Sequence, residues 1–176
     1  MNWTIDPTHS SIDFSVRHLA ISTVRGRFRN FSANAELGPD GRLLKVEATI
    51  DPQSIDTGVA DRDAHLRSAD FFDVAKYPEI RFVSTFIKPV DQGRTEVTGE
   101  LTMHGVTKPI SFVLEQGQAI KDPWGNSRLA AEASGKLNRK EWGLTWNQVL
   151  ELGGVAVSEE VKWSFEVEAV AQAKAA

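Results

Sequence analysis

The chain has 176 residues, of which 41% are hydrophobic and 25% are charged, and its formal net charge is −4 at pH 7. This composition is typical of a soluble globular protein, and the length suffices for one domain with a sizeable core. The acidic balance argues against a nucleic-acid partner, which would need a basic surface. The chain contains no cysteine, which excludes disulfide bonds, a thiol nucleophile and a cysteine-ligated metal.

The N-terminal stretch MNWTIDPTHSSIDF has neither a basic start nor an apolar run of signal-peptide length. No stretch approaches the roughly 20 apolar residues that a membrane-spanning helix needs. We therefore expect no integral membrane segment. If Met1 is the natural start we expect a cytoplasmic protein, whereas a signal removed beforehand would place it in the periplasm.

Alternation of apolar and polar residues predicts that most of the chain is β-strand. The pattern begins at residues 11–17 and then changes parity inside residues 24–37, which predicts a bulge near Asn30. Over residues 44–50 it places Leu44, Val46, Ala48 and Ile50 on one face. The same alternation recurs over 80–82, 97–103, 110–115, 129–137 and 161–168. We expect about eight strands.

The connections indicate antiparallel neighbours and one domain. Clusters of Gly, Pro, Asp and Asn at 38–42, 91–94 and 121–126 predict short hairpin turns. The connection 52–78 contains DRDAHLRSADFFD, which predicts a short helix with Asp61 as its N-cap. Residues 139–160 are mixed in character and predict a partly helical or irregular segment. We expect a single domain over 1–172 and a frayed tail over 173–176.

Antiparallel strands with one apolar face each form a sandwich or close into a barrel, and closure removes exposed edges. An eight-stranded barrel encloses packed side chains or one small ligand. The inward positions of residues 129–137 are unusually small, because they include Ala131, Ala133 and Gly135. Replacing an inward Leu by Ala costs about 2–5 kcal/mol where the site cannot collapse. Either a bulky neighbour, such as Trp142, Trp146 or Trp163, or an apolar ligand fills that space.

Five segments, in order along nearly the whole chain, resemble the YceI-like, polyisoprenoid-binding family of bacterial lipocalin-like proteins. The combination of His-Leu-Arg-Ser-Ala-Asp-Phe (65–71) with Gly-Val-Thr-Lys-Pro (105–109) is highly specific. The matching segments are SIDFSVRHLAISTVRGRF (11–28), RDAHLRSADFFDVAKYPEIRF (62–82), GELTMHGVTKPISF (99–112), DPWGNSRLAAEASGKLNRKEWG (122–143) and EEVKWSFEVEAV (159–170).

The resemblance implies an all-β fold, namely an extended eight-stranded antiparallel up-and-down β-barrel with a short helix in the 52–78 connection. It also implies a long apolar channel that binds and sequesters or carries a lipid. That lipid would be a polyisoprenoid, such as a polyprenyl diphosphate or a quinone tail, or a fatty-acid-like chain. The resemblance implies no catalytic residue set and no cofactor other than the bound lipid.

On this basis we predict a channel, a flap and a head-group site. The flap is the segment 61–73, and Arg is suited to the head-group site because its guanidinium binds phosphate oxygens in a fork geometry. The predicted channel residues are Phe14, Val16, Phe28, Leu66, Phe71, Phe72, Phe82, Leu101, Phe112, Ala131, Ala133, Gly135, Trp142, Trp146 and Phe165. The head-group candidates are Arg17, His18, His65, Arg67 and Arg139. Alternatively, these five residues pair at the surface with Asp61, Asp63, Asp70 and Asp73.

Other functions have little support in the sequence. The four histidines show no metal-ligand spacing, and no GxSxG, GxGxxG or P-loop motif is present, so we expect neither a metal site nor nucleotide chemistry. Arg25, Arg27 and Arg29 share a strand face, which is either solvated or in contact with anionic lipid heads. Two rivals remain: an enzyme acting on an isoprenoid or lipid at the barrel mouth, and an interaction module with a packed core. A homodimer also remains open.

Overall fold

The computed structural model describes residues 1–151 and 153–172. One antiparallel sheet contains the strands β1 (Asn2–Ile5), β2 (Ser11–His18), β3 (Ser22–Phe28), β4 (Phe31–Leu37), β5 (Leu43–Ile50), β6 (Ile55–Asp56), β7 (Ile80–Asp91), β8 (Arg94–Met103), β9 (Val106–Gln116), β10 (Ile120–Lys121), β11 (Ser127–Asn138) and β12 (Val157–Ala171). The helix α1 (Ala60–Arg67) and the 3₁₀ turns Pro7–His9, Pro52–Ser54 and Arg139–Trp142 complete the described elements.

The sheet closes into a barrel of eight strands, as predicted. β1 and β2 together form one barrel strand interrupted by the turn Pro7–His9, and β3 and β4 form a second one. Each barrel strand pairs with the next along the chain, and the order is β1–β2, β3–β4, β5, β7, β8, β9, β11 and β12. β12 closes the circle, because its C-terminal part pairs with β1 and its N-terminal part with β2.

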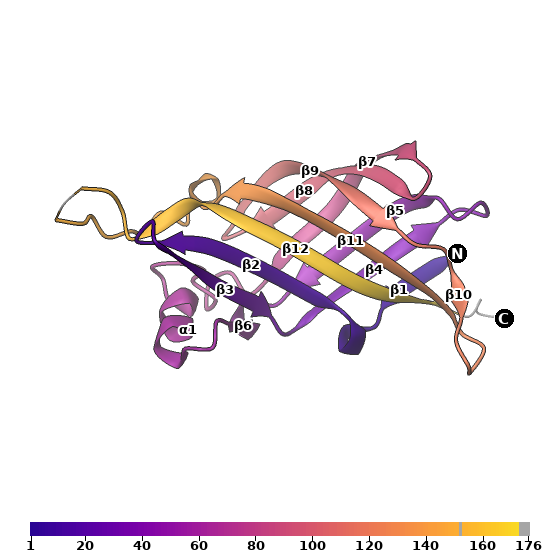
Figure 1. The fold of residues 1–176 in the computed structure, drawn as a ribbon, viewed down its shortest axis with the longest axis horizontal. Coiled ribbons are helices and arrows are strands. Elements are labelled where there is room, and N and C mark those ends of the chain that lie inside the picture. The colour runs from indigo at the N-terminus through magenta and orange to yellow at the C-terminus, as the bar shows by residue number, and fades with distance from the viewer. Residues whose placement is uncertain (152, 173–176) are drawn as a thin grey trace.

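The barrel is elongated. β12 has 15 residues, and a strand of that length extends roughly 50 Å at about 3.3 Å per residue. Figure 1 shows β11 and β12 running along most of the molecule, with α1 at one end and the N-terminus and the end of β12 at the other. We call these the helix end and the terminus end. Among the described residues, no helix is long and apolar enough to cross a bilayer.

The parity change near Asn30 is a break between β3 and β4 at residues 29 and 30. The Asn30 N–H donates to Ser54 Oγ at 2.9 Å, and the Arg29 N–H donates to the Ser54 carbonyl oxygen at 3.2 Å. On either side of the break the chain changes its partner, because β3 pairs with the short β6 and β4 pairs with β5. The predicted bulge is therefore a full interruption, located where it was expected.

The helix is shorter than the predicted segment, and its predicted cap is wrong. Val59 is the N-cap and makes no side-chain cap bond, and Asp61 lies in the first helical turn. The Asp63 carboxylate, which is buried, instead accepts hydrogen bonds from the Thr57 N–H at 2.9 Å and the Thr57 hydroxyl at 2.6 Å. α1 ends at Arg67, so Phe71 and Phe72 lie in the following turns. The predicted tail 173–176 lies outside the described residues.

Candidate functional site

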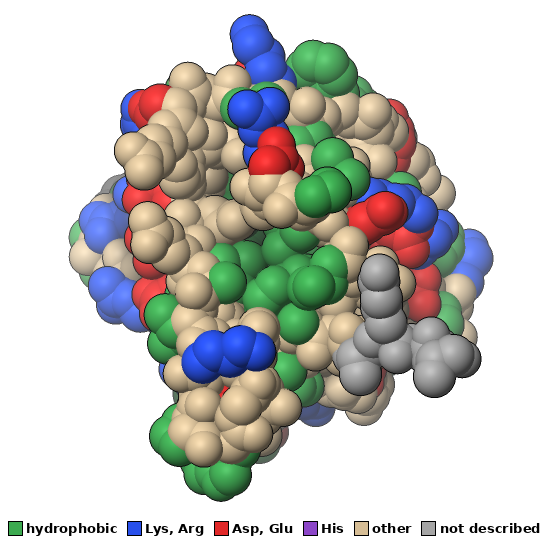
Figure 2. Space-filling view, turned by 90° about the vertical axis from the view of Figure 1, so that its right-hand side faces the viewer, with side chains coloured by type: hydrophobic (Ala, Val, Ile, Leu, Met, Phe, Trp, Pro, Cys, Tyr) green, Lys and Arg blue, Asp and Glu red, His purple; other side chains and the backbone are tan. Residues whose placement is uncertain are grey.

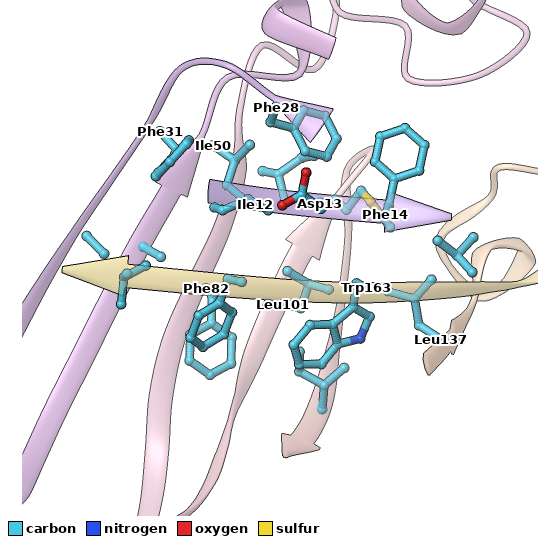
Figure 3. Close-up of a pocket in the computed structure, with 18 of the residues that line it drawn as sticks. Ile12, Asp13, Phe14, Phe28, Phe31, Ile50, Phe82, Leu101, Leu137 and Trp163 are labelled. Atoms are coloured by element: carbon cyan, nitrogen blue, oxygen red, sulfur yellow. The ribbon is translucent and has the colours of Figure 1, made fainter. Parts of the chain in front are cut away.

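The barrel encloses an apolar cavity of about 480 Å³. This volume lies within the range of roughly 300–1,000 Å³ that is usual for small-molecule sites. All eight barrel strands contribute to its wall. Figure 3 shows Phe14 and Phe28 on one side of the cavity and Phe82 and Trp163 on the other. The wall therefore offers an elongated hydrocarbon surface rather than a set of polar contacts.

Aromatic rings on this wall form two groups. Phe28 lies 5.6 Å from Phe14 and 5.9 Å from Phe72, measured between ring centroids. Phe112 is the centre of the second group, with Phe82 at 5.6 Å, Trp163 at 5.4 Å and Phe165 at 5.9 Å. Tilted and edge-to-face pairs at such distances fix the rings against one another. This wall is preorganised by its own packing.

The small residues of β11 are largely explained by neighbouring rings. A Cβ atom added at Gly135 would lie 2.5 Å from Cζ2 of Trp163, its direct partner on β12. Ala133 is buried opposite Phe165 in the same way. The lining residues among the described part of the chain do not include Ala133 or Gly135, which corrects their assignment to the channel. Ala131, two positions earlier, does line the cavity.

A second set of small residues faces the cavity directly. Ala33 and Ala35 of β4 and Ala48 of β5 all line it, and Ala33 pairs with Ala48 across the two strands. Their methyl groups leave space that larger aliphatic side chains would occupy in a packed core, where density normally matches that of organic crystals. The cavity is therefore set by alanines on β4, β5 and β11.

The helix end is covered by an aromatic cluster. Leu66, Phe71 and Phe72 line the cavity from the segment predicted as a flap. The His65 ring lies edge-on to Trp146 at 4.7 Å and to Phe71 at 5.1 Å, so that α1 is joined to the loop 143–156. His65 Nε2 lies 2.8 Å from Asp70 Oδ2, within hydrogen-bond distance.

Two arginines bring positive charge to this end of the cavity. Arg62 lines the cavity while its guanidinium donates to the Thr57 hydroxyl at 2.7 Å and to the Thr57 carbonyl oxygen at 2.9 Å. Arg139 is only 4% exposed and donates to three backbone carbonyl oxygens, those of Ser158, Leu144 and Val157.

Arg139 has no carboxylate within ion-pair distance among the described residues. Burial lowers the pKa of its guanidinium below the usual range, but an arginine remains charged in proteins. The helix end thus holds a buried cation at the cavity wall that donates its hydrogen bonds to backbone carbonyl oxygens and lies 5.9 Å from the centroid of the Phe71 ring. An anionic group in the cavity would be a favourable counterion.

The terminus end of the cavity is lined mainly by buried apolar side chains. Trp3, Leu37, Leu43, Leu114 and Leu129 line the cavity there and are all buried. Figure 2 looks onto this end and shows hydrophobic side chains gathered in its middle, with charged side chains around them. The charged and imidazole side chains His18, Arg62, His65 and Arg139 line the cavity at the helix end, whereas Gln116 at the end of β9 is a polar lining residue of the terminus end.

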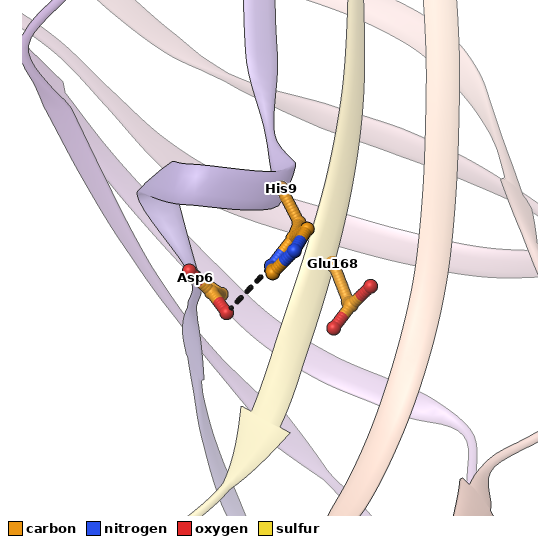
Figure 4. A group of neighbouring side chains, drawn as sticks. All are labelled: Asp6, His9 and Glu168. Carbon is orange, nitrogen blue, oxygen red and sulfur yellow. Dashed lines mark hydrogen bonds and ion pairs between the residues drawn. The ribbon is translucent and has the colours of Figure 1, made fainter. Parts of the chain in front are cut away.

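The group Asp6, His9 and Glu168 comes closest to a metal-ligand arrangement among the described residues, and it lies outside the barrel wall (Figure 4). Arg128 already balances its charge: the guanidinium lies 3.1 Å from Asp6 Oδ2, pairs with Glu168, and reaches Asp122 Oδ2 at 2.8 Å. The Thr8 hydroxyl, His9 and Arg128 hold the pKa of Asp6 well below its usual range. The geometry is that of an ion-pair network.

The structure places twelve of the fifteen predicted channel residues on the cavity wall: Phe14, Val16, Phe28, Leu66, Phe71, Phe72, Phe82, Leu101, Phe112, Ala131, Trp146 and Phe165. Trp142 is a further correction, because it is 2% exposed and its indole N–H donates to the Leu101 carbonyl oxygen at 3.0 Å, behind the wall.

Of the head-group candidates, His18, His65 and Arg139 line the cavity and two do not. Arg17 lies outside and donates to the Thr23 hydroxyl and the Ala20 carbonyl oxygen. Arg67 holds the backbone carbonyls of Gln53 and Ile55. Sequence reasoning missed Arg62, although its spacing of four from Leu66 on a helix puts both on one face.

A closed eight-stranded up-and-down barrel around one apolar cavity defines the class of lipocalin-like barrels. A family model described as the YceI-like domain matches residues 3–169. A UPF0312 protein of Pseudomonas putida strain GB-1 is 36% identical over 165 residues, which cover 93% of this chain and 82% of that protein. A Staphylococcus aureus USA300 UPF0312 protein is 36% identical over 169 residues, covering 95% and 96%. The chain therefore belongs to the YceI-like family.

Solved structures share the fold. The Campylobacter jejuni YceI protein superposes with a TM-score of 0.78 at 31% identity, covering 89% of this chain and 90% of that one. A Saccharophagus degradans domain described as a polyisoprenoid binding domain gives a TM-score of 0.72 at 18% identity, covering 97% and 98%. The second likeness shows the fold alone.

Proposed function

We propose that this protein binds one lipid with a long apolar chain inside the barrel, with a polyisoprenoid as the favoured class. The observation that carries the proposal is the cavity of about 480 Å³ lined by alanines and aromatic rings. Water in such a lumen makes few hydrogen bonds, and an apolar chain would remove its surface from water and restore the missing packing contacts. The S. degradans neighbour, described as polyisoprenoid binding, supports the class of lipid.

We place the lipid head group at the helix end. Arg62 and Arg139 line the cavity there together with His18 and His65, and the terminus end is lined mainly by buried apolar side chains. An anionic head, such as a diphosphate, would therefore face the two arginines, and the chain would extend toward the terminus end. Both guanidinium groups are held in place by the protein, Arg62 by the Thr57 hydroxyl and carbonyl oxygen and Arg139 by backbone carbonyl oxygens, as suits groups that bind a head group.

Two alanines adjacent in β11 test the proposal. Ala131 faces the cavity and Ala130 is exposed on the outer face. We expect geranylgeranyl diphosphate to bind the parent protein, measured by isothermal titration calorimetry, and Ala131→Phe to weaken binding at least tenfold by filling the lumen. Ala130→Phe adds the same ring outside and should bind like the parent. No binding by the parent, or equal binding by both variants, would contradict the proposal.

A further inference from the structure

Exposed aliphatic side chains gather at the tip of the helix end. Ile21, in the turn between β2 and β3, is 78% exposed, and Val149, in the loop 143–156, is 80% exposed. The two segments are joined, because the Leu19 N–H donates to the Ala156 carbonyl oxygen at 2.8 Å. Figure 1 shows both beyond α1, at the far left. We call Leu19, Ile21, Val149 and Val155, all exposed, the apolar tip.

The β2–β3 turn has a sequence that its own geometry disfavours. Leu19 and Ala20 have φ values of 52° and 58°, and the Ile21 N–H donates to the His18 carbonyl oxygen at 3.2 Å. Two consecutive left-handed residues define the two-residue hairpin turn in which Asn-Gly is strongly preferred. Leucine and alanine are strained there, and both are exposed. The exposed aliphatic residues of this turn are thus not explained by folding, and such strain concentrates at functional positions.

The apolar tip adjoins the polar end of the cavity. His18 immediately precedes the turn and pairs with Val157 at the start of β12, and both residues line the cavity. A surface that covered the tip would therefore lie next to the end of the cavity where we place the head group.

Positive charge lies directly behind the tip on the outer face of the barrel. Arg25, Ser15, Lys162 and Lys136 lie in register across β3, β2, β12 and β11. Lys136 pairs with Glu160, Arg27 with Asp13, and Lys140 with Glu159. The ion pairs of the described residues leave Arg17, Arg25 and Lys162 without a carboxylate partner. Glu151 of the loop and Asp61 and Asp73 of the α1 segment are acidic residues of the helix end that are likewise absent from these ion pairs. The whole chain, by contrast, has a net charge of −4.

We propose that the helix end docks onto an anionic lipid bilayer. The apolar tip enters the boundary between head groups and acyl chains, and Arg17, Arg25 and Lys162 face the anionic head groups. Exposed aliphatic residues with cations behind them are the pairing that holds peripheral proteins at such surfaces. Docking would bring the cavity next to a membrane from which it could take up a lipid. This consequence of docking rests on the proposed function, whereas the docking itself does not. The docking itself is measured without any lipid in the lumen.

Vesicle flotation tests the proposal. We expect the parent protein to float with vesicles of equal parts phosphatidylcholine and phosphatidylglycerol, much less with phosphatidylcholine alone, and less as salt is raised. The double variant Ile21→Asp/Val149→Asp should bind at least tenfold more weakly. Val90→Asp/Ile120→Asp places the same charges on exposed aliphatic positions of β7 and β10 and should bind like the parent.

Leu19→Asn/Ala20→Gly is a second tip variant, which should have a higher unfolding midpoint and weaker flotation, because it relieves the turn and removes a leucine. Two flotation results would overturn the proposal: no flotation of the parent, or equal losses of flotation in the tip and control double variants. Conversion of a dimer to a monomer by the tip variants would also overturn it, because the tip would then be a self-association surface. Geranylgeranyl diphosphate titration of the tip variants should match the parent, so a failure of docking is distinguishable from a failure of lipid binding.

Discussion

Two walls of the barrel use small residues for opposite purposes. On β8 and β11, Gly99 and Gly135 lie beneath the rings of Phe82 and Trp163, so the missing side chains are replaced by aromatic carbon from the neighbouring strand. On β4 and β5, Ala33 and Ala48 line the cavity. A small inward residue is therefore not by itself evidence for a ligand. What decides is whether a neighbouring ring already fills its place.

Adding one methyl group to the packed wall should have the largest effect on stability. A Cβ at Gly99 would lie 2.4 Å from Phe82 and 2.5 Å from the Val83 carbonyl oxygen, so the backbone must shift. We expect Gly99→Ala to lower the free energy of unfolding by about 1–3 kcal/mol, as overpacking does, measured by urea denaturation. Gly117→Ala is the control, because its nearest neighbour lies 3.6 Å away. Equal small losses in both variants would show that the wall is not tightly packed.

A substitution at the charged end of the cavity should change the affinity for an anionic lipid more than it changes the stability of the fold. Arg62→Gln removes a cation that lines the cavity. We expect about tenfold weaker binding of geranylgeranyl diphosphate, or roughly 1.4 kcal/mol, and unchanged binding of geranylgeraniol, which lacks the charge. Arg42→Gln, at an exposed arginine in the turn between β4 and β5, is the control. If Arg62→Gln weakens both ligands equally, the head group is not where we place it.

Adding carbon to the wall formed by β4 and β5 should raise the free energy of unfolding, whereas Gly99→Ala should lower it. Ala48→Leu extends into the cavity, and each buried methylene contributes roughly 0.8 kcal/mol. We expect the free energy of unfolding without lipid to rise by about 1 kcal/mol and lipid affinity to fall. A loss of stability as large as that of Gly99→Ala would mean that both walls are packed alike.

The smallest expected effect is on the pH dependence of stability, through the ion-pair network of Arg128 outside the barrel wall. The pKa values of Asp6 and Asp122 are depressed below their usual 3.8, the first mainly by the Thr8 hydroxyl and the second mainly by Arg128. A depressed pKa stabilises the fold above the unfolded value, and this contribution is lost as pH falls through the folded value. We expect stability to decline below about pH 4, and Arg128→Gln to make the decline shallower in acid titrations followed by circular dichroism. An unchanged slope would exclude the network as its cause.

The sequence predicted the antiparallel strands because strand alternation and short turns are local signals, and the break near Asn30 followed from a parity change. The alternation placed Leu44 on the same face as Val46 and Ala48, and this prediction is wrong. Leu43 is buried and Leu44 is 55% exposed, because the pairing of β4 and β5 shifts register between Glu36 and Leu37. The family resemblance added the closed topology and the channel.

The errors in the site share a physical cause, which is that residue size does not reveal what a neighbouring strand supplies. Ala133 and Gly135 are covered by rings on β12, and Trp142 is held by a backbone carbonyl behind the wall. Likewise, residue type does not distinguish Arg67, which donates to backbone carbonyl oxygens and does not line the cavity, from Arg62, which does line it. These distinctions depend on cross-strand register and on the path of the 52–78 connection.

The lipid content of the purified protein shows whether the barrel holds a long apolar chain. Protein prepared without detergent is extracted with organic solvent, and the extract is analysed by mass spectrometry for the parent and for Ala131→Phe. We expect close to one long-chain lipid per parent barrel and far less in the variant. A parent extract without lipid, from protein that also takes up none when offered polyprenyl lipids, would contradict the proposed function.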